Sequence, residues 1–505
     1  MLTRVQTAGL HGVEAIPVTV EVGLTSGLPT FTVVGLPQSA VREGRERVLS
    51  ALRHIGVALP PRRITVNLAP ADRRKEGTGF DLPLAIALLV AAAEVSPESV
   101  QGVGFVGELG LDGALRRVRG VLARAAGCRA GGARVLVVPR GNVAEARAVP
   151  GLEVRTAGDL AELRDCLVGR RSWPRLPDPT EVDSASLPDL ADVRGQPFAR
   201  RALEVAAAGG HNLLFVGPPG VGKTLLARRL PGLLPELDPG EAVEVTRIHS
   251  AAGLLPDGAG LVSVRPFRAP HHSVSDAGLV GGGQPIRPGE ATLAHRGVLF
   301  LDELPEFRRS SLELLRQPME EGRIHLVRAR GAMEFPARFT LVAAMNPCPC
   351  GDLGNPTRSC GCDPSQIRRY RGRLSGPLLD RIDLQVLVSG VSGVELISPR
   401  PGEATEVVRS RVRAARERQW ERFAGRGLGC NAEMGPGELR SLVPVPRAVA
   451  RLLQHAQDRL GLSPRAYHRI LKVARTLADL SGDSDVAEAH AAEAIHFREL
   501  DRPPR

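Results

Sequence analysis

The chain has 505 residues, a length that suggests about three or four domains. Its apolar fraction of 43% and charged fraction of 24% are those of a folded globular protein and exclude wholesale disorder. The net charge of +11 favours a polyanionic partner such as nucleic acid, although a general preference for arginine would also produce it. No apolar run approaches the ~20 residues of a membrane span. The first residues lack a signal-peptide pattern, so we expect a cytoplasmic protein without a membrane partner.

The first part of the chain, 1–168, alternates strand and helix patterns. ITVNLA (64–69) and RVLVVPR (134–140) indicate buried strands, and FDLPLAIALLVAAAEV (80–95) indicates a helix. The stretch 169–190 is rich in Pro, Ser and Asp and lacks periodicity, which predicts a linker.

A glycine-rich phosphate-binding motif follows the strand pattern LLFV (213–216) and precedes a helix pattern. In such a motif, backbone N–H groups surround phosphate, the lysine neutralises the β- and γ-phosphates, and the hydroxyl coordinates Mg²⁺. Only three of the 66 basic residues are lysines, yet one stands at this position. The motif therefore predicts an ATP site made of Gly217, Pro218, Pro219, Gly220, Val221, Gly222, Lys223 and Thr224.

Two further strand patterns end in polar residues. VLFLDE (298–303) would deliver Asp302 as a Mg²⁺ ligand and Glu303 as the group that polarises the attacking water. FTLVAAMN (339–346) would place Asn346 near the γ-phosphate or the water. The alternatives are ordinary solvated acids in the first case and a plain Asn turn in the second.

Two arginines are candidates for a role in ATP hydrolysis. SGPLLDRIDL (375–384) contains Arg381, which could reach the γ-phosphate bound by a neighbouring subunit or pair locally with Asp380 or Asp383. LSPRAYHRIL (462–471) places Arg465 at a helix start, from which it could fold back onto the nucleotide. From about 435 the chain indicates three amphipathic helices.

The seven cysteines do not indicate a disulfide framework, because their number is odd and their spacing is uneven. Four of them form two C-x-C pairs separated by nine residues. A structural Zn²⁺ site, a group of reduced thiols and a redox pair are all compatible with this spacing. His271 and His272 receive no ligand role. The pairs consist of Cys348, Cys350, Cys360 and Cys362.

These motifs, in this order, resemble the AAA+ ATPases of the magnesium-chelatase-like group. Longer segments are similar to the YifB/ComM family of bacterial proteins over nearly the whole chain. They are VGLPQSAVREGRERVLSAL, RRITVNLAPADRRKEGTGFDLPLA, FRAPHHSVSDAGLVGGG, LFLDELPEF and NPCPCG.

The resemblance implies an α/β multidomain protein. A Lon-protease-like α+β domain would occupy 1–168 and the linker 169–190. An AAA+ core with a parallel sheet would occupy 191–395, and a connecting segment with a helical lid 396–505. Lys223 and Thr224 would be the Walker A pair and Asp302 and Glu303 the Walker B pair. The remaining roles would be sensor 1 for Asn346, trans-acting arginine finger for Arg381 and sensor 2 for Arg465.

The family resemblance also implies a function. The resemblance to members of the ComM type implies a ring-shaped, hexameric DNA motor that uses ATP and Mg²⁺. Such a motor would promote branch migration when incoming DNA recombines during natural transformation. The expected protein is thus an ATP hydrolase and DNA helicase or translocase, with single-stranded or branched DNA as its partner. A magnesium-chelatase motor subunit and a nucleotide-gated regulatory module are the alternatives.

The family further predicts two insertions in the core, at about 255–296 and at 322–339. The second reads as a basic hairpin with Arg328 and Arg330 near its tip, which we expect to contact the DNA backbone; a plain exposed hairpin is the alternative. In the Lon-like domain, Gly79 and Leu122 stand where Lon proteases carry the catalytic serine and lysine. A Ser–Lys peptidase is therefore not expected.

Overall fold

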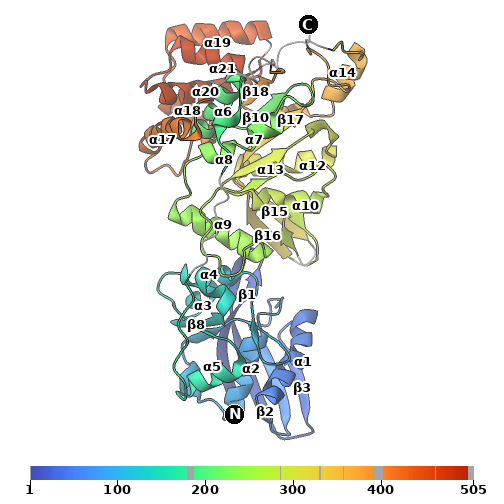
Figure 1. Ribbon diagram of the computed structural model, residues 1–505, viewed down its shortest axis with the longest axis vertical. Helices are drawn as coiled ribbons and strands as arrows, with labels where there is room; N and C mark the ends of the chain where they lie inside the picture. The colour runs from blue at the N-terminus through green and yellow to red at the C-terminus, as the bar shows by residue number, and fades with distance from the viewer. Residues whose placement is uncertain are drawn as a thin grey trace. The chain divides into compact units, whose positions relative to one another are not determined.

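The computed structural model describes residues 2–178, 187–284, 286–328, 331–355, 358–391, 402–460 and 462–498 (Figure 1). The chain forms two compact units. The first is built from 1–184, 238–263 and 286–288, and the second from 185–237, 264–285 and 289–505. In the described part of the chain, no helix is both long and apolar enough to cross a membrane. The sequence-based domain boundaries remain predictions, because these units are defined by packing and not by continuous segments.

The first unit is organised around a seven-stranded mixed sheet of order β3-β4-β2-β1-β5-β8-β9. β1, β2 and β4 pair antiparallel, whereas β5, β8 and β9 continue the sheet in parallel. The strands of the sheet and the short β6–β7 hairpin and β13 are β1 Leu2–His11, β2 Glu14–Thr25, β3 Thr30–Val34, β4 Arg63–Ala69, β5 Val103–Phe105, β6 Glu108–Leu109, β7 Leu115–Arg116, β8 Val135–Pro139, β9 Glu153–Ala157 and β13 Arg287–Pro288.

Helices of the first unit contribute to two separate hydrophobic clusters. One cluster takes side chains from α1, α2 and α5, and the other takes side chains from α3 and α4. Every residue of α2 is buried; the helix expected at 80–95 ends at Ala91, and Ala93 then adopts φ 62°. The helices are α1 Ser39–His54, α2 Asp81–Ala91, α3 Val121–Ala130, α4 Val143–Arg147, α5 Leu160–Leu167 and α9 Pro239–Ala252.

Helix α9 comes from the middle of the chain but packs in the first unit. Asp238 and Glu241 form a capping box that starts the helix. Val243 packs against the cluster of α3 and α4, and the Ser250 hydroxyl donates to Glu145 over 2.5 Å. Burial raises the pKa of Glu145, and the hydrogen bond from the Ser250 hydroxyl opposes this shift. A segment within the expected AAA+ core thus completes the core of the N-terminal unit.

The second unit contains a five-stranded sheet of order β11-β14-β17-β10-β18, in which all neighbours are parallel. This confirms the expected parallel-sheet core. β10, the first strand in the chain, lies between β17 and β18. The strands, with the separate β15–β16 hairpin and β12, are β10 Leu213–Val216, β11 Phe267–Arg268, β12 Gly281–Gly282, β14 Val298–Leu301, β15 Arg323–Arg328, β16 Gly331–Pro336, β17 Thr340–Met345 and β18 Leu384–Leu387.

The C-terminal helices share one hydrophobic cluster with the sheet and with α6. α17 and α20 both pack on α6, and α21 packs on α20. The helices of the second unit are α6 Pro197–Gly209, α7 Lys223–Ala227, α8 Leu230–Leu233, α10 Asp276–Val280, α11 Glu290–Leu293, α12 Arg309–Leu314, α13 Arg316–Glu321, α14 Pro364–Arg371, α15 Gly376–Leu379, α17 Thr405–Arg422, α18 Pro436–Leu442, α19 Arg447–Leu460, α20 Pro464–Ser481 and α21 Glu488–His496.

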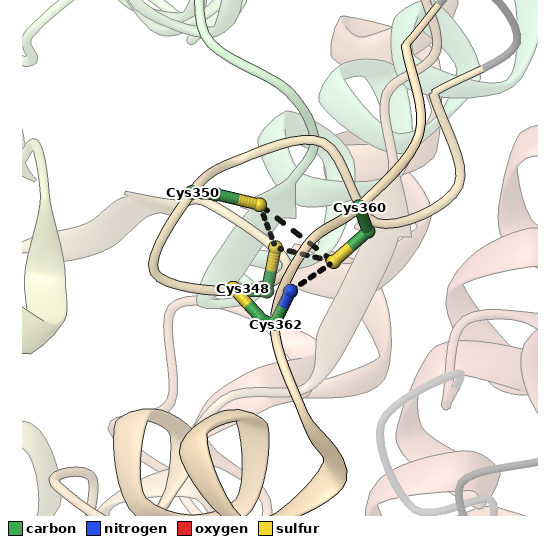
Figure 2. A group of neighbouring side chains, drawn as sticks. All are labelled: Cys348, Cys350, Cys360 and Cys362. Atoms are coloured by element: carbon green, nitrogen blue, oxygen red, sulfur yellow. Dashed lines mark hydrogen bonds between the residues drawn. The ribbon is translucent and has the colours of Figure 1, made fainter.

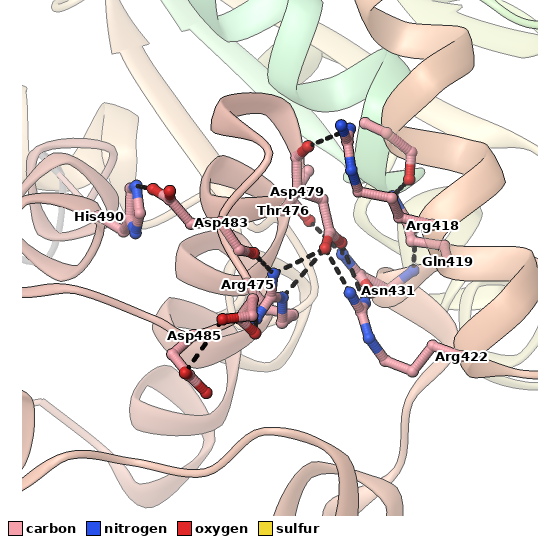
Figure 3. A network of polar contacts seen from close by, with 12 residues as sticks. Arg418, Gln419, Arg422, Asn431, Arg475, Thr476, Asp479, Asp483, Asp485 and His490 are labelled. Atoms are coloured by element: carbon pink, nitrogen blue, oxygen red, sulfur yellow. Dashed lines mark hydrogen bonds and ion pairs between the residues drawn. The ribbon is translucent and has the colours of Figure 1, made fainter.

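A buried polar network joins α17 to α20 (Figure 3). Its centre is Asp479, whose side chain is fully buried. The carboxylate accepts from Arg475 Nη2 at 2.8 Å, from Arg422 Nη1 at 3.0 Å and from Asn431 Nδ2 at 2.8 Å. Burial lowers the pKa of Arg475, an effect that Asp479 opposes. Asp479 thus compensates the buried guanidinium of Arg475 and the partly buried guanidinium of Arg422.

We expect Asp479→Ala to lower the free energy of unfolding by about 3–5 kcal/mol, because it leaves buried arginine charges without their partner. Denaturant unfolding followed by circular dichroism measures the change. Asp485→Ala, at an exposed acid in the next loop, is the matched control and should cost less than about 0.5 kcal/mol. Equal losses in the two variants would contradict the assigned role.

Candidate functional site

The glycine-rich loop joins β10 to α7 at the carboxyl end of the parallel sheet. Gly220 and Gly222 have φ 80° and 90°, in the left-handed region that favours glycine. A Cβ on Gly217 would lie 2.2 Å from the Val388 carbonyl oxygen, so no larger residue fits there. The fold therefore requires glycine at these three positions of the motif.

Lys223 is the first residue of α7, and its side chain turns back over the loop. Nζ donates to the carbonyl oxygens of Gly217 at 2.7 Å and Pro218 at 2.9 Å, and to Asn346 Oδ1 at 3.0 Å. Burial lowers the pKa of Lys223, while the negative charges of Asp302 and Glu303 oppose this effect. The structure thus brings together the lysine, the loop and the expected sensor Asn.

Thr224 and Asp302 lie side by side at the same end of the sheet. Asp302 directly follows β14, and its Oδ2 accepts a hydrogen bond of 2.7 Å from the Thr224 hydroxyl. The Glu303 backbone N–H donates to Asp302 Oδ1 over 2.9 Å. Oxygen ligands of this kind suit Mg²⁺, so the pair fits the ion that the sequence predicts here.

Glu303 has an unusual backbone conformation and a partner that the sequence analysis missed. Its φ of 52° lies in the left-handed region, which is uncommon for a residue other than glycine and occurs often at functional sites. His272 Nδ1 lies 3.5 Å from Glu303 Oε2, and the His272 ring meets Phe307 edge-on. His272 follows the two-residue edge strand β11, so no periodic pattern in the sequence pointed to it.

Asn346 follows β17, the neighbour of both β10 and β14 in the sheet. Tyr370, on α14, is buried and hydrogen-bonded to the Asn346 backbone; burial raises the pKa of Tyr370 to about 12. Arg371 Nε donates to the Pro347 carbonyl at 3.3 Å. Helix α14 thus supports the segment that carries Asn346.

Arg381 is held within its own chain by contacts that differ from the local pair considered above. Its guanidinium is buried, forms an ion pair with Glu320 on α13 and donates to the Pro377 carbonyl at 2.5 Å. Burial lowers the pKa of Arg381; Glu320 opposes the effect, whereas the positive charges of Arg316, Arg469 and Arg465 add to it.

The helix that begins near Arg465 packs at the amino end of the sheet. Asp383, just before β18, accepts from the backbone N–H of Asn212, just before β10, at 3.2 Å. Arg469, one helical turn after Arg465, forms a 2.5 Å ion pair with Asp383. Burial alone would raise the pKa of Asp383, but Arg469 and His211 hold it well below its usual range. Arg465 acts electrostatically on Arg381, so the two arginines lie near each other, and its expected role at the nucleotide stays a prediction.

The four clustered cysteines lie in one group, which begins two residues after Asn346 in the chain (Figure 2). Their sulfur atoms all lie within 4.8 Å of one another, and none is in a disulfide. A hydrogen bond from the Asp352 backbone contributes most to lowering the pKa of Cys350 to about 6, whereas burial raises that of Cys348. The structure thus unites the two predicted C-x-C pairs in one group.

The basic hairpin expected at 322–339 is present as β15 and β16, which pair antiparallel. Arg323 at its base forms a 2.7 Å ion pair with Glu334. Arg330 and the side chain of Arg328 lie outside the described residues. Their expected position near the tip stays a prediction.

Three family models match the chain. The model for magnesium chelatase, subunit ChlI, covers residues 189–396. The model for subunit ChlI of Mg-chelatase covers 20–142, and the model for the ChlI C-terminal region covers 402–498. The matches therefore span parts of both compact units, including the phosphate loop, the carboxylates and the two arginines.

Relatives align over nearly the whole length. YifB of Escherichia coli is 46% identical over 508 residues, with 99% of this chain and 98% of the relative covered. Competence protein ComM of Haemophilus influenzae is 45% identical over 510 residues, again with 99% and 98% covered. The magnesium-chelatase 38 kDa subunit of Acidiphilium rubrum is 27% identical over 327 residues, with 59% of this chain and 85% of that protein covered.

Proposed function

Since this chain belongs to the magnesium-chelatase-like family that includes YifB and ComM, we propose that it is an oligomeric ATPase that moves DNA. The observation that carries the proposal is the meeting of Lys223, Thr224, Asp302 and Asn346 at one end of the parallel sheet. The competence name of the Haemophilus influenzae relative supports a role in natural transformation, and the process that we propose there is branch migration of incoming DNA.

The residues divide the work of hydrolysis among them. Lys223 binds and neutralises the β- and γ-phosphates, and Asn346, 3.0 Å from its ammonium, orients the γ-phosphate or the water. Glu303 polarises the attacking water. Thr224 and Asp302 would hold Mg²⁺, which would supply charge neutralisation on the phosphates.

Arg381 and Arg465 serve the nucleotide of a neighbouring subunit. Both lie near the amino ends of the strands, whereas the phosphate loop follows the carboxyl end of β10. A strand of four residues separates these ends by roughly 13 Å. Two cationic residues on the side away from their own loop are suited to complete a second site in a ring, as arginine fingers do in trans.

ATPase assays with DNA test the proposal. We expect hydrolysis to be stimulated by single-stranded or branched DNA. We also expect a labelled four-way junction to be unwound in the presence of ATP. Lys223→Ala should abolish both activities, because it removes the phosphate contact. Junction processing that survives in Lys223→Ala would refute an ATP-driven motor.

The hairpin β15–β16 provides the DNA contact. We expect the double variant Arg328→Ala with Arg330→Ala to bind DNA more weakly. The slope of log K against log salt concentration should become less steep by about 1.4–1.8, the effect of losing two phosphate contacts. Binding titrations at several salt concentrations measure the slope. Arg323→Ala is the matched control, because Arg323 is already paired with Glu334 at the hairpin base. An unchanged slope in the double variant would disprove the contact.

A chelatase motor is the second candidate, because all three matching family models are named for subunit ChlI. The same ATPase assay separates the two. Stimulation by porphyrin and the other chelatase components, with no response to DNA, would replace the DNA motor by this function.

A further inference from the structure

The four-cysteine cluster has the dimensions of a metal site. The Sγ–Sγ distances are 3.4 Å from Cys348 to Cys350, 3.7 Å from Cys348 to Cys360 and 3.6 Å from Cys350 to Cys360. A zinc ion with four thiolates at about 2.3 Å requires tetrahedral edges of about 3.8 Å. A disulfide would bring two sulfur atoms to about 2.05 Å. These three separations, together with a Cys362 sulfur atom that lies within 4.8 Å of the other three, match shared ligation of one ion better than oxidation.

Two turns supply the ligands, and each is attached to a regular element. Cys348 follows β17 by three residues, and the Gly351 backbone N–H donates to its carbonyl at 3.1 Å. Cys362 directly precedes Asp363, whose side chain caps α14. In Figure 2 the sulfur atoms of Cys348, Cys350 and Cys360 turn toward one another. An ion bound here would tie the end of β17 to the start of α14.

The same turn packs against the phosphate loop. A Cβ placed on Gly351 would lie 2.7 Å from Pro219 Cδ and 4.0 Å from Asn346 Cγ. Asn346 stands two residues before Cys348, and its backbone is also bonded to Tyr370 of α14. The cysteine turn, the loop and the sensor Asn thus form one packed unit, and a shift of the turn would move Asn346 relative to Lys223.

We propose that Cys348, Cys350, Cys360 and Cys362 bind one Zn²⁺, and that this ion holds Asn346 in place against the phosphate loop. Four thiolates from protein side chains and no position left for water describe a structural zinc site. A residue in a functional site must be held close to its productive position by rigid surroundings, and a metal-bound turn provides such surroundings for Asn346. The effect on hydrolysis rests on the proposed ATPase function, whereas the metal site does not.

Metal analysis of the purified full-length chain tests the site by itself. We expect one zinc per chain, and slow reaction of the exposed Cys350 with a thiol reagent until a chelator is added. Cys360→Ser with Cys362→Ser should abolish zinc binding. Cys166→Ser is the matched control, because Cys166 is buried in the first unit, and should keep it. A metal-free wild-type chain with four freely reactive thiols would overturn the proposal, as would the visible absorbance of an iron centre.

Steady-state ATPase kinetics test the supporting role. The zinc-free double variant should lose about 10²-fold in kcat while retaining ATP affinity, because Asn346 is misplaced and Lys223 is not. Adding Asn346→Ala to it should cause little further loss, since both changes remove the same interaction. Fully additive losses would overturn the link to Asn346. If the serine variants fail to fold, zinc removal from the wild-type chain by a chelator gives the same comparison. A wild-type chain that binds zinc but hydrolyses no ATP would refute the proposed function and leave the metal-site proposal standing.

Discussion

Glu303→Gln is expected to slow ATP hydrolysis by roughly 10²–10⁴-fold while ATP still binds. The amide keeps the size of the carboxylate but cannot accept a proton from the attacking water. Lys223 contacts the loop, and Thr224 contacts Asp302, without the Glu303 side chain, so the phosphate and Mg²⁺ interactions should persist. Steady-state ATPase rates and titration with a fluorescent ATP analogue measure the two properties separately.

Lys223→Ala provides the contrast for this experiment. It should lose both nucleotide affinity and hydrolysis, because the ammonium is the positive charge that lies over the loop. A Glu303→Gln protein that hydrolyses ATP within a few-fold of the wild-type rate would show that another group activates the water. His272, 3.5 Å from Glu303, would then be the first residue to examine.

The phosphate loop, Thr224, Asp302 and Asn346 could be predicted because each stands at the end of a short buried strand. Parallel strands bring their carboxyl ends together, so residues far apart in the chain converge without further information. The structure places β10, β14 and β17 next to one another, and the expected residues meet there. The C-x-C pairs were predictable for a similar reason, since each pair is a single tight turn.

The packing of α9 could not be predicted in this way. Its capping box marks where a helix begins, but local sequence does not say which surface the helix covers. The tertiary contacts of the helix, such as those of Val243 and Ser250, assign it to the first unit. The positions of His272 and Arg465 also depend on long-range packing. His272 follows a two-residue strand, and the helix that carries Arg465 is held by the ion pair of Arg469 with Asp383.

Arg381→Ala is expected to reduce ATP hydrolysis about 10³-fold or more, which is the contribution of an arginine finger. The guanidinium is buried beside Glu320, so loss of folding must be separated from loss of the finger. Glu320→Gln is the matched control, because it removes the ion-pair partner and keeps Arg381. This control should retain activity, and circular dichroism should show both variants folded.

Mixing two inactive variants tests whether Arg381 acts between subunits. Arg381→Ala keeps its own phosphate loop, and Lys223→Ala keeps its arginine, so one type of mixed interface contains both functional groups. If subunits assemble at random in a ring, about a quarter of the interfaces are of this type, and ATPase activity should return to at most that fraction. An arginine that served its own subunit would give no recovery at any ratio. Because Arg381 and the phosphate loop lie at opposite ends of the parallel strands, we expect recovery.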